Sequence, residues 1–139
     1  MRRGCRPGQW TAWPGSPAAP PTPEPLQHAA SVALTVGSEY YRLLCDSYRA
    51  KRDYLMRELQ RIGFSVRRPA GTYFLAADFR PLGFRDDVAF CRMLIEKIGV
   101  AAIPLSAFYA DGFEQRIARF CFAKKDETLA LALDRLAAL

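Results

Sequence analysis

Apolar and polar positions follow helical or strand periods along most of the chain. Residues 23–34 carry apolar positions at helical spacing behind an early proline and glutamate, and this pattern ends near Gly37. Ser38 then begins a long amphipathic helix through Ile62, and Gly63 supplies its C-terminal glycine. We expect an apolar stripe of this helix to pack on a core: Tyr41, Leu44, Cys45, Tyr48, Leu55, Leu59 and Ile62.

The rest of the chain mixes strand and helix patterns. Residues 64–66 and the β-branched and aromatic run 72–78 predict two neighbouring strands. Next come a helix over 86–98 capped by Asp86 and ended by Gly99, a short buried strand over 100–104, a loop over 106–115, a strand over 116–123 and a helix capped by Asp126. This order is typical of an α+β fold, and we predict a two-layer αβ sandwich with helices on a small sheet.

The first 22 residues differ from the rest in composition. Seven of the ten prolines fall within residues 7 to 25. Because such a segment cannot propagate a helix or a central strand, we predict a disordered tail over residues 1–22 and a folded domain over 23–139. The tail has arginines but few serines and no amphipathic repeat. We therefore expect a cytoplasmic protein, with mitochondria or plastids as the alternatives.

Composition excludes several classes of partner. A chain of 139 residues, 50% of them apolar, can build one domain with its own core. No apolar run approaches the ~18 residues of a membrane-spanning helix, so we expect no membrane partner. The net charge is +6, but from Leu26 onward 17 basic residues are interspersed with 13 acidic ones, which indicates a solvated surface and no nucleic-acid site.

Few side chains could carry catalysis or hold a metal. His28 is the sole histidine, which excludes Ser/His/Asp and Cys/His arrangements. The cysteines lack C-x-x-C spacing, and we interpret them as reduced, mostly buried side chains with no metal site: Cys5, Cys45, Cys91 and Cys121. We expect all the lysines to be solvated: Lys51, Lys97, Lys124 and Lys125. No residue is assigned a catalytic role.

Arg119 is the most informative position. In the predicted strand, Ile117, Arg119 and Cys121 point to one face, and the alternate residues point to the other. A guanidinium among apolar neighbours needs a carboxylate partner. That partner is either internal, such as Asp78 on a neighbouring strand, or the carboxylate of a ligand, which the planar five-donor fork suits well. The pattern alone leaves both open.

Several strings together resemble the C-terminal part of class I pyridoxal-phosphate aminotransferases, nearest to the kynurenine/glutamine/methionine aminotransferase group. They are GTYFLAADF from Gly71, DDVAFCRMLIEKIGVAAIPLSAFY from Asp86 and RIARFCFAKKDETL from Arg116. TPEPLQHAASVAL from Thr22 is similar to the segment with which that family leaves its large domain. The resemblance covers about residues 21–139, and residues 1–20 do not share it.

The resemblance implies the small C-terminal domain of a fold-type I transferase, which acts on an amino acid and a 2-oxo acid. In that family the arginine of the R-F-x-F motif holds the substrate α-carboxylate, and Arg119 matches it, which favours the ligand interpretation. Tyr73, in the G-T-Y-F motif, matches a residue of the pocket wall.

The family's cofactor site has no counterpart here. The resemblance implies pyridoxal 5′-phosphate as cofactor, but the family's lysine, phosphate-binding groups and aspartate lie N-terminal to the matched part. We therefore expect the C-terminal part of an amino-acid transaminase. By itself, this chain should be inactive and should not hold the cofactor. We expect the family homodimer only when the large domain is present. The alternative is a non-catalytic module that binds carboxylates or amino acids. A further possibility is a marginally stable chain with exposed apolar surface on the long helix and around Arg119.

Overall fold

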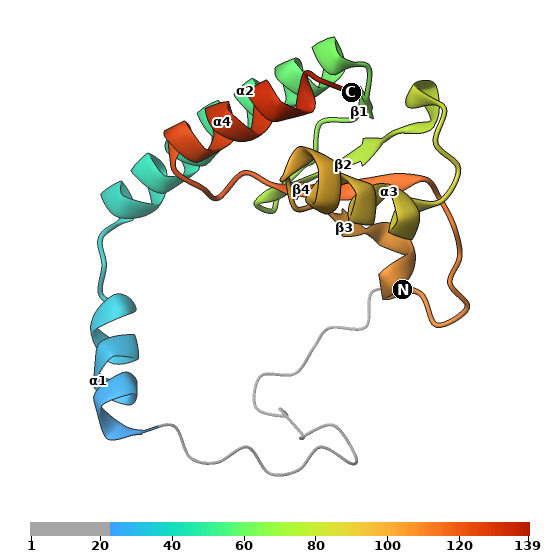
Figure 1. Ribbon diagram of the computed structural model, residues 1–139. Coiled ribbons are helices and arrows are strands. Elements are labelled where there is room, and N and C mark those ends of the chain that lie inside the picture. Colours follow the sequence, from blue (N-terminus) through green and yellow to red (C-terminus); the bar gives the residue numbers. More distant parts are fainter. Residues whose placement is uncertain (1–22) are drawn as a thin grey trace, which may run out of the picture. The chain divides into compact units, whose positions relative to one another are not determined.

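The computed structural model describes residues 23–139 (Figure 1). Contacts divide the described residues into two units, with the division after Gly37. In the first unit, helix α1 (Glu24–Ala33) begins after Pro23, and none of its residues is buried. The predicted tail over 1–22 lies outside the described residues, and the domain boundary after it stays a prediction.

The second unit contains every other predicted element in the expected order. Its helices and strands are α2 (Ser38–Ile62), β1 (Ser65–Val66), β2 (Phe74–Asp78), α3 (Asp87–Met93), β3 (Ile103–Pro104), β4 (Ile117–Cys121) and α4 (Asp126–Leu136). Short helical turns lie at Arg80–Leu82, Leu94–Ile98 and Leu105–Phe108. Among residues 23–139, no helix has the length and apolar character needed to cross a membrane.

The four strands form one antiparallel sheet in the order β1-β2-β4-β3. One face of the sheet carries the core, and α2 and α4 run side by side above it (Figure 1). Along β4, Ala118 and Phe120 are buried on this face, whereas Ile117, Arg119 and Cys121 lie on the other. The alternation predicted for this strand and the two-layer α+β arrangement are both confirmed.

Aromatic rings fill the centre of the core. Phe90 of α3 is stacked on Phe79 with ring centroids 4.2 Å apart, and its ring also meets those of Phe64 and Phe84. The Phe64 ring packs edge-on against Phe120 of β4 at 5.6 Å. These contacts fix α3 against the sheet, and α3 begins with residues that support the site described below.

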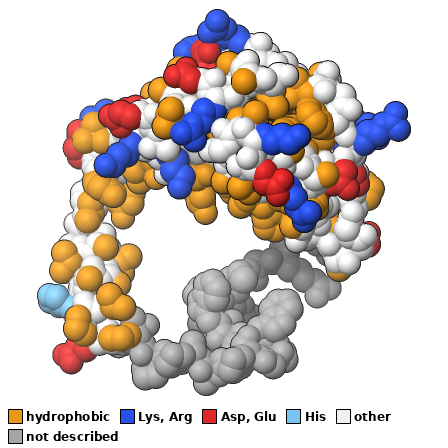
Figure 2. All heavy atoms as spheres, in the orientation of Figure 1, with side chains coloured by type: hydrophobic (Ala, Val, Ile, Leu, Met, Phe, Trp, Pro, Cys, Tyr) orange, Lys and Arg blue, Asp and Glu red, His pale blue; other side chains and the backbone are white. Residues whose placement is uncertain are grey.

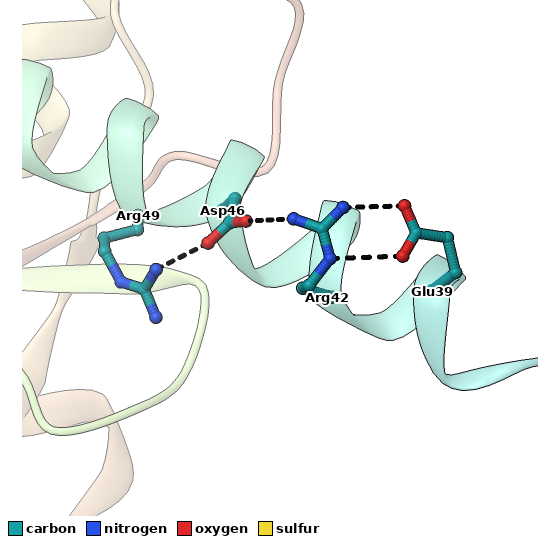
Figure 3. Close-up of polar contacts among 4 residues, drawn as sticks. All are labelled: Glu39, Arg42, Asp46 and Arg49. Carbon is teal, nitrogen blue, oxygen red and sulfur yellow. Dashed lines mark hydrogen bonds and ion pairs between the residues drawn. The ribbon is translucent and has the colours of Figure 1, made fainter.

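The stripe predicted along α2 is only half correct. Leu55 and Leu59 are buried and Tyr48 and Ile62 pack against the core, but Tyr41, Leu44 and Cys45 are exposed. These three side chains are exposed because no element of the described 38–139 unit covers the first turns of this helix. The polar side of these turns carries a row of exposed ion pairs formed by Glu39, Arg42, Asp46 and Arg49. Arg42 contacts the carboxylates of Glu39 and Asp46 (Figure 3).

Some strand and helix ends differ from the prediction. β2 begins at Phe74 because Thr72 has a positive φ of 75°, which breaks the extended run. The strand expected over 100–104 shrinks to Ile103–Pro104, the part that pairs with β4. Asp126 is the first residue of α4 and not its cap, and its carboxylate lies 3.4 Å from the Lys51 amine.

The predictions for the cysteines and for one lysine also need correction. Cys91 is buried, but Cys45 and Cys121 are exposed, because they lie on the uncovered part of α2 and on the open face of the sheet. All three are free thiols, and Cys5 lies outside the described residues. Lys51 is not simply solvated, since its amine also donates a 2.6 Å hydrogen bond to the carbonyl of Lys124.

Candidate carboxylate-binding site

Arg119 lies at the middle of the open face of the sheet. It pairs with Ala76 of β2 on one side and with Ile103 of β3 on the other, so strands flank it on both edges. Ala76 is small, and its side chain leaves the neighbouring surface free for the arginine. The backbone of this residue is therefore fixed by two ladders while its side chain points away from the core.

Two aromatic rings pack on the Arg119 guanidinium. Its Cζ lies 3.7 Å from the ring centroid of Phe74 and 4.4 Å from that of Phe108. Cation–π contacts of this kind contribute about 0.5–1 kcal/mol each at exposed sites and more when they are shielded from water. The rings limit the rotation of the guanidinium, so its donors stay in a defined plane.

The Arg119 side chain has an unsatisfied donor. Its Nε is buried and has no hydrogen-bond partner in the described structure. An orphaned buried donor costs about 1–3 kcal/mol, and a carboxylate that lies in the plane of the guanidinium could accept from it. Within residues 23–139, this donor therefore stays without an acceptor.

The internal partner that the sequence left open is excluded. Asp78 lies opposite Ile117 in the sheet register, two positions along from Ala76. Its carboxylate accepts hydrogen bonds from Arg80, with Nε at 2.8 and 3.0 Å. This guanidinium holds the pKa of Asp78 below its ordinary value of 3.8. Among residues 23–139, no carboxylate forms an ion pair with Arg119.

Tyr73 lies at the border of the site and not against the guanidinium. Its side chain is 54% exposed, and its ring meets the Phe74 ring edge-on at 5.5 Å. Its carbonyl accepts a 3.0 Å hydrogen bond from the amide of Phe122, just beyond β4. Phe74 contacts both the Tyr73 ring and the Arg119 guanidinium, and the wall role of Tyr73 stays a prediction.

The sequence pattern did not single out Phe74 as a partner of Arg119. Its position on the same face as Ala76 and Asp78 of β2 was available from strand alternation, but the register that sets it beside Arg119 was not. Phe108 lies in the loop expected over residues 106–115. Its ring position depends on the turn after β3, which carries no sequence period.

Three carboxylates lie close together near the start of α3: Asp86, Asp87 and Glu114, with ligand atoms within 4.8 Å of one another. Their oxygens already accept from protein donors. Asp86 accepts from the amide of Ala89 as the helix cap, as predicted, at 2.6 Å. Asp87 accepts from Ser106, and Glu114 accepts from the amides of Asp87 and Arg116. The cluster is thus a hydrogen-bond network between segments.

The chain belongs to the aminotransferase class I and II family, a group of pyridoxal-phosphate-dependent enzymes, with the match covering residues 17–136. It begins slightly before residue 21, where the resemblance was expected to start. The solved structures described below confirm the expected fold, the C-terminal small domain of a fold-type I transferase.

Curated relatives include the methionine aminotransferase of Escherichia coli, 45% identical over 112 residues, which covers 81% of this chain and 29% of the relative. A probable N-succinyldiaminopimelate aminotransferase of Mycobacterium tuberculosis is 44% identical over 124 residues, covering 83% and 31%. A kynurenine–oxoglutarate transaminase of Dictyostelium discoideum is 32% identical over 135 residues. The chain therefore spans about 30% of the length of these relatives.

Solved structures of aminotransferases likewise match this chain over about 30% of their own length. N-succinyldiaminopimelate aminotransferase from Mycobacterium tuberculosis superposes with a TM-score of 0.76 at 46% identity, over 82% of this chain and 30% of that one. The methionine aminotransferase from Escherichia coli superposes with a TM-score of 0.75 at 44% identity, over 83% of this chain and 30% of that one.

Proposed function

We propose that this chain is the part of an amino-acid transaminase that holds the α-carboxylate of an amino acid or a 2-oxo acid. The observation that carries this proposal is Arg119, whose guanidinium lies against Phe74 and Phe108 and whose buried Nε has no partner among residues 23–139. Bidentate hydrogen bonds to a guanidinium fix both the position and the orientation of a carboxylate. Tyr73, at the border of the site, would limit the space beside the bound acid.

Pyridoxal phosphate does not fit the residues of this chain by itself. Attachment of the cofactor as a Schiff base requires a lysine whose amine is readily deprotonated, for example by an apolar setting. Lys51 is engaged by Asp126 and by a carbonyl, and the other three lysines are exposed. We propose that the chain alone is inactive, and that the cofactor and the family homodimer require the other 70% or so of a full-length relative.

Calorimetric titration of the full chain with L-methionine tests the carboxylate site, and L-methioninamide, which lacks the carboxylate, is the ligand control. Arg119→Ala should weaken L-methionine binding by at least about tenfold, since a hydrogen bond to a charged group is worth roughly 1.5–3 kcal/mol. Arg92→Ala, at an exposed position of α3, is the matched control and should bind like the parent. Equal affinities for the parent and Arg119→Ala would refute the site.

The cofactor statement has its own test. The chain is incubated with pyridoxal phosphate, reduced with borohydride and digested, and the lysine-containing peptides are measured by mass spectrometry. We expect no lysine to be modified stoichiometrically. Stoichiometric modification of one lysine would mean that this chain attaches the cofactor by itself.

A non-catalytic carboxylate-binding module is the second candidate. It is favoured by the composition of the site, because Phe74, Phe108 and Arg119 all come from this chain. A chimaera that joins residues 23–139 to the N-terminal part of the Mycobacterium tuberculosis relative separates the two functions. Transaminase activity that is lost with Arg119→Ala is expected for the enzyme part. An inactive, folded chimaera that still binds L-methionine would favour the module.

A further inference from the structure

Asp87 is a fully buried charged residue, with 0% exposure, at the first position of α3. Asp86 already caps that helix, so Asp87 is not needed for the cap. Both of its carboxylate oxygens go to one residue, 19 positions further along the chain. Oδ2 accepts from the amide of Ser106 at 2.8 Å, and Oδ1 accepts from its hydroxyl at 2.6 Å. A buried carboxylate is costly without such donors, so this pairing fixes Ser106 firmly.

Ser106 lies in the turn that carries Phe108. The turn Leu105–Phe108 directly follows β3 and is closed by a 3.0 Å hydrogen bond from the amide of Tyr109 to the carbonyl of Ser106. The Phe108 side chain is 56% exposed, so burial in the core does not hold its ring. Its place against the Arg119 guanidinium therefore depends on the backbone of the turn.

The chain before β4 is tied to the same helix start. Glu114 accepts from the amide of Asp87 at 2.8 Å and also from the amide of Arg116, whose φ of 57° lies in the left-handed region. Arg116 precedes Ile117, the first residue of β4. Both segments that flank the Arg119 strand, the Ser106 turn and the Arg116 corner, are therefore anchored at Asp87.

We propose that Asp87 is a positioning residue for the carboxylate site: through Ser106 it holds the Phe108 ring against Arg119. Its effect on ligand binding rests on the function proposed above, whereas its effect on the guanidinium does not require any ligand. The first readout therefore uses the free chain.

Nuclear magnetic resonance of the full chain tests the positioning without ligand. The Nε–Hε signal of Arg119 is assigned as the one that Arg119→Lys removes. Aromatic rings shift protons that lie over their faces, so Phe108→Ala should move this signal. Asp87→Asn should move it in the same direction, and it should have little further effect when Phe108 is already alanine. The neighbouring Asp86→Asn, which keeps a good cap residue, should leave it in place.

Additive shifts from Asp87→Asn and Phe108→Ala, or a folded Asp87→Asn whose Arg119 signal matches the parent, would overturn the positioning role. If Asp87→Asn does not fold, Ser106→Ala replaces it. That variant removes only the hydroxyl bond and keeps the amide bond, and a smaller shift in the same direction is expected. An unchanged Arg119 signal in a folded Ser106→Ala would then be the overturning result.

Titration with L-methionine then connects the positioning to the ligand. Asp87→Asn should weaken binding about two- to fivefold, because a guanidinium that the Phe108 ring no longer holds must be ordered when the ligand binds, and it should cause no further loss in the Phe108→Ala background. Equal binding by Asp87→Asn and the parent would overturn this step. If the parent does not bind L-methionine but the Arg119 signal responds as expected, the proposed function fails and the positioning role stands.

Discussion

Phe90→Ala is the sharpest stability test of the structure, because this one side chain of α3 contacts three other rings of the core. Phe90 is 1% exposed, and its ring contacts those of Phe64, Phe79 and Phe84. The same helix begins with Asp87, so loosening it also loosens the anchor of the carboxylate site.

The expected cost follows from the kind of contact that is lost. Truncating a buried phenylalanine to alanine typically destabilises a protein by about 3–5 kcal/mol, through lost transfer energy and the cavity that remains. Phe90→Leu keeps most of the apolar volume and removes the ring pairs, so we expect a loss of about 0.5–1.5 kcal/mol. Phe113→Ala, an exposed loop aromatic at 56%, is the control and should stay within about 0.5 kcal/mol.

Urea unfolding, followed by circular dichroism and by tyrosine fluorescence on the same samples, measures these free energies. Coincident transitions and an unchanged slope are required before the values are compared. A loss below about 2 kcal/mol for Phe90→Ala, or a loss as large for Phe113→Ala, would mean that the ring cluster does not hold α3 in the way the structure indicates.

Three further predictions concern acid, thiols and the first half of α2. Because Arg80 lowers the pKa of Asp78, the ionised carboxylate stabilises the folded chain above its ordinary pKa of 3.8, and this stabilisation is lost as the pH falls. Asp78→Asn should therefore flatten the fall in melting temperature below about pH 4. Burial, together with nearby carboxylates, raises the pKa of the Cys91 thiol to about 12. A maleimide at about pH 8 should therefore label the exposed Cys45 and Cys121 and should label Cys91 only after urea unfolds the chain. Labelling of Cys91 in the native chain would contradict this. Removing the bridging arginine of Figure 3, as Arg42→Ala, should speed amide exchange in the first turns of α2 and leave the turns near Leu55 unchanged; equal effects along the helix would mean that it opens as one unit.

The order of elements could be predicted because each helix and strand has its own local period. The long helix, for example, needs only the spacing of its apolar residues and the glycine at its end. How far that helix is covered could not be predicted in the same way. The spacing that buries Leu55 and Leu59 also includes Tyr41 and Leu44, and only the length of the neighbouring elements leaves the latter two exposed.

The site was predictable in part for a similar reason. Strand alternation set Arg119 on one face among apolar neighbours, and the resemblance to a family favoured a ligand. Whether Asp78 pairs with Arg119, however, depended on register, which is a long-range property of two strands. The contact between Asp87 and Ser106 is also long-range, and the adjacent pair Asp86 and Asp87 does not reveal which acid caps the helix and which is buried.

The surroundings of Arg119 also determine how strongly the proposed site can bind a carboxylate. Apolar side chains near the site or on its face of the sheet are half-exposed, including Tyr73, Ile103, Phe108 and Tyr109, and Figure 2 shows hydrophobic side chains gathered along one margin of the 38–139 unit. In an open site, water competes for the guanidinium and screens its charge, so the attraction to a carboxylate is a small fraction of its value in a dry site. Phe74 and Phe108 shield part of the guanidinium, and Arg119 as a whole is half-buried. We therefore expect the proposed site to bind a carboxylate weakly. The decisive measurement is the fold-change in affinity between the parent and Arg119→Ala, and not the absolute affinity.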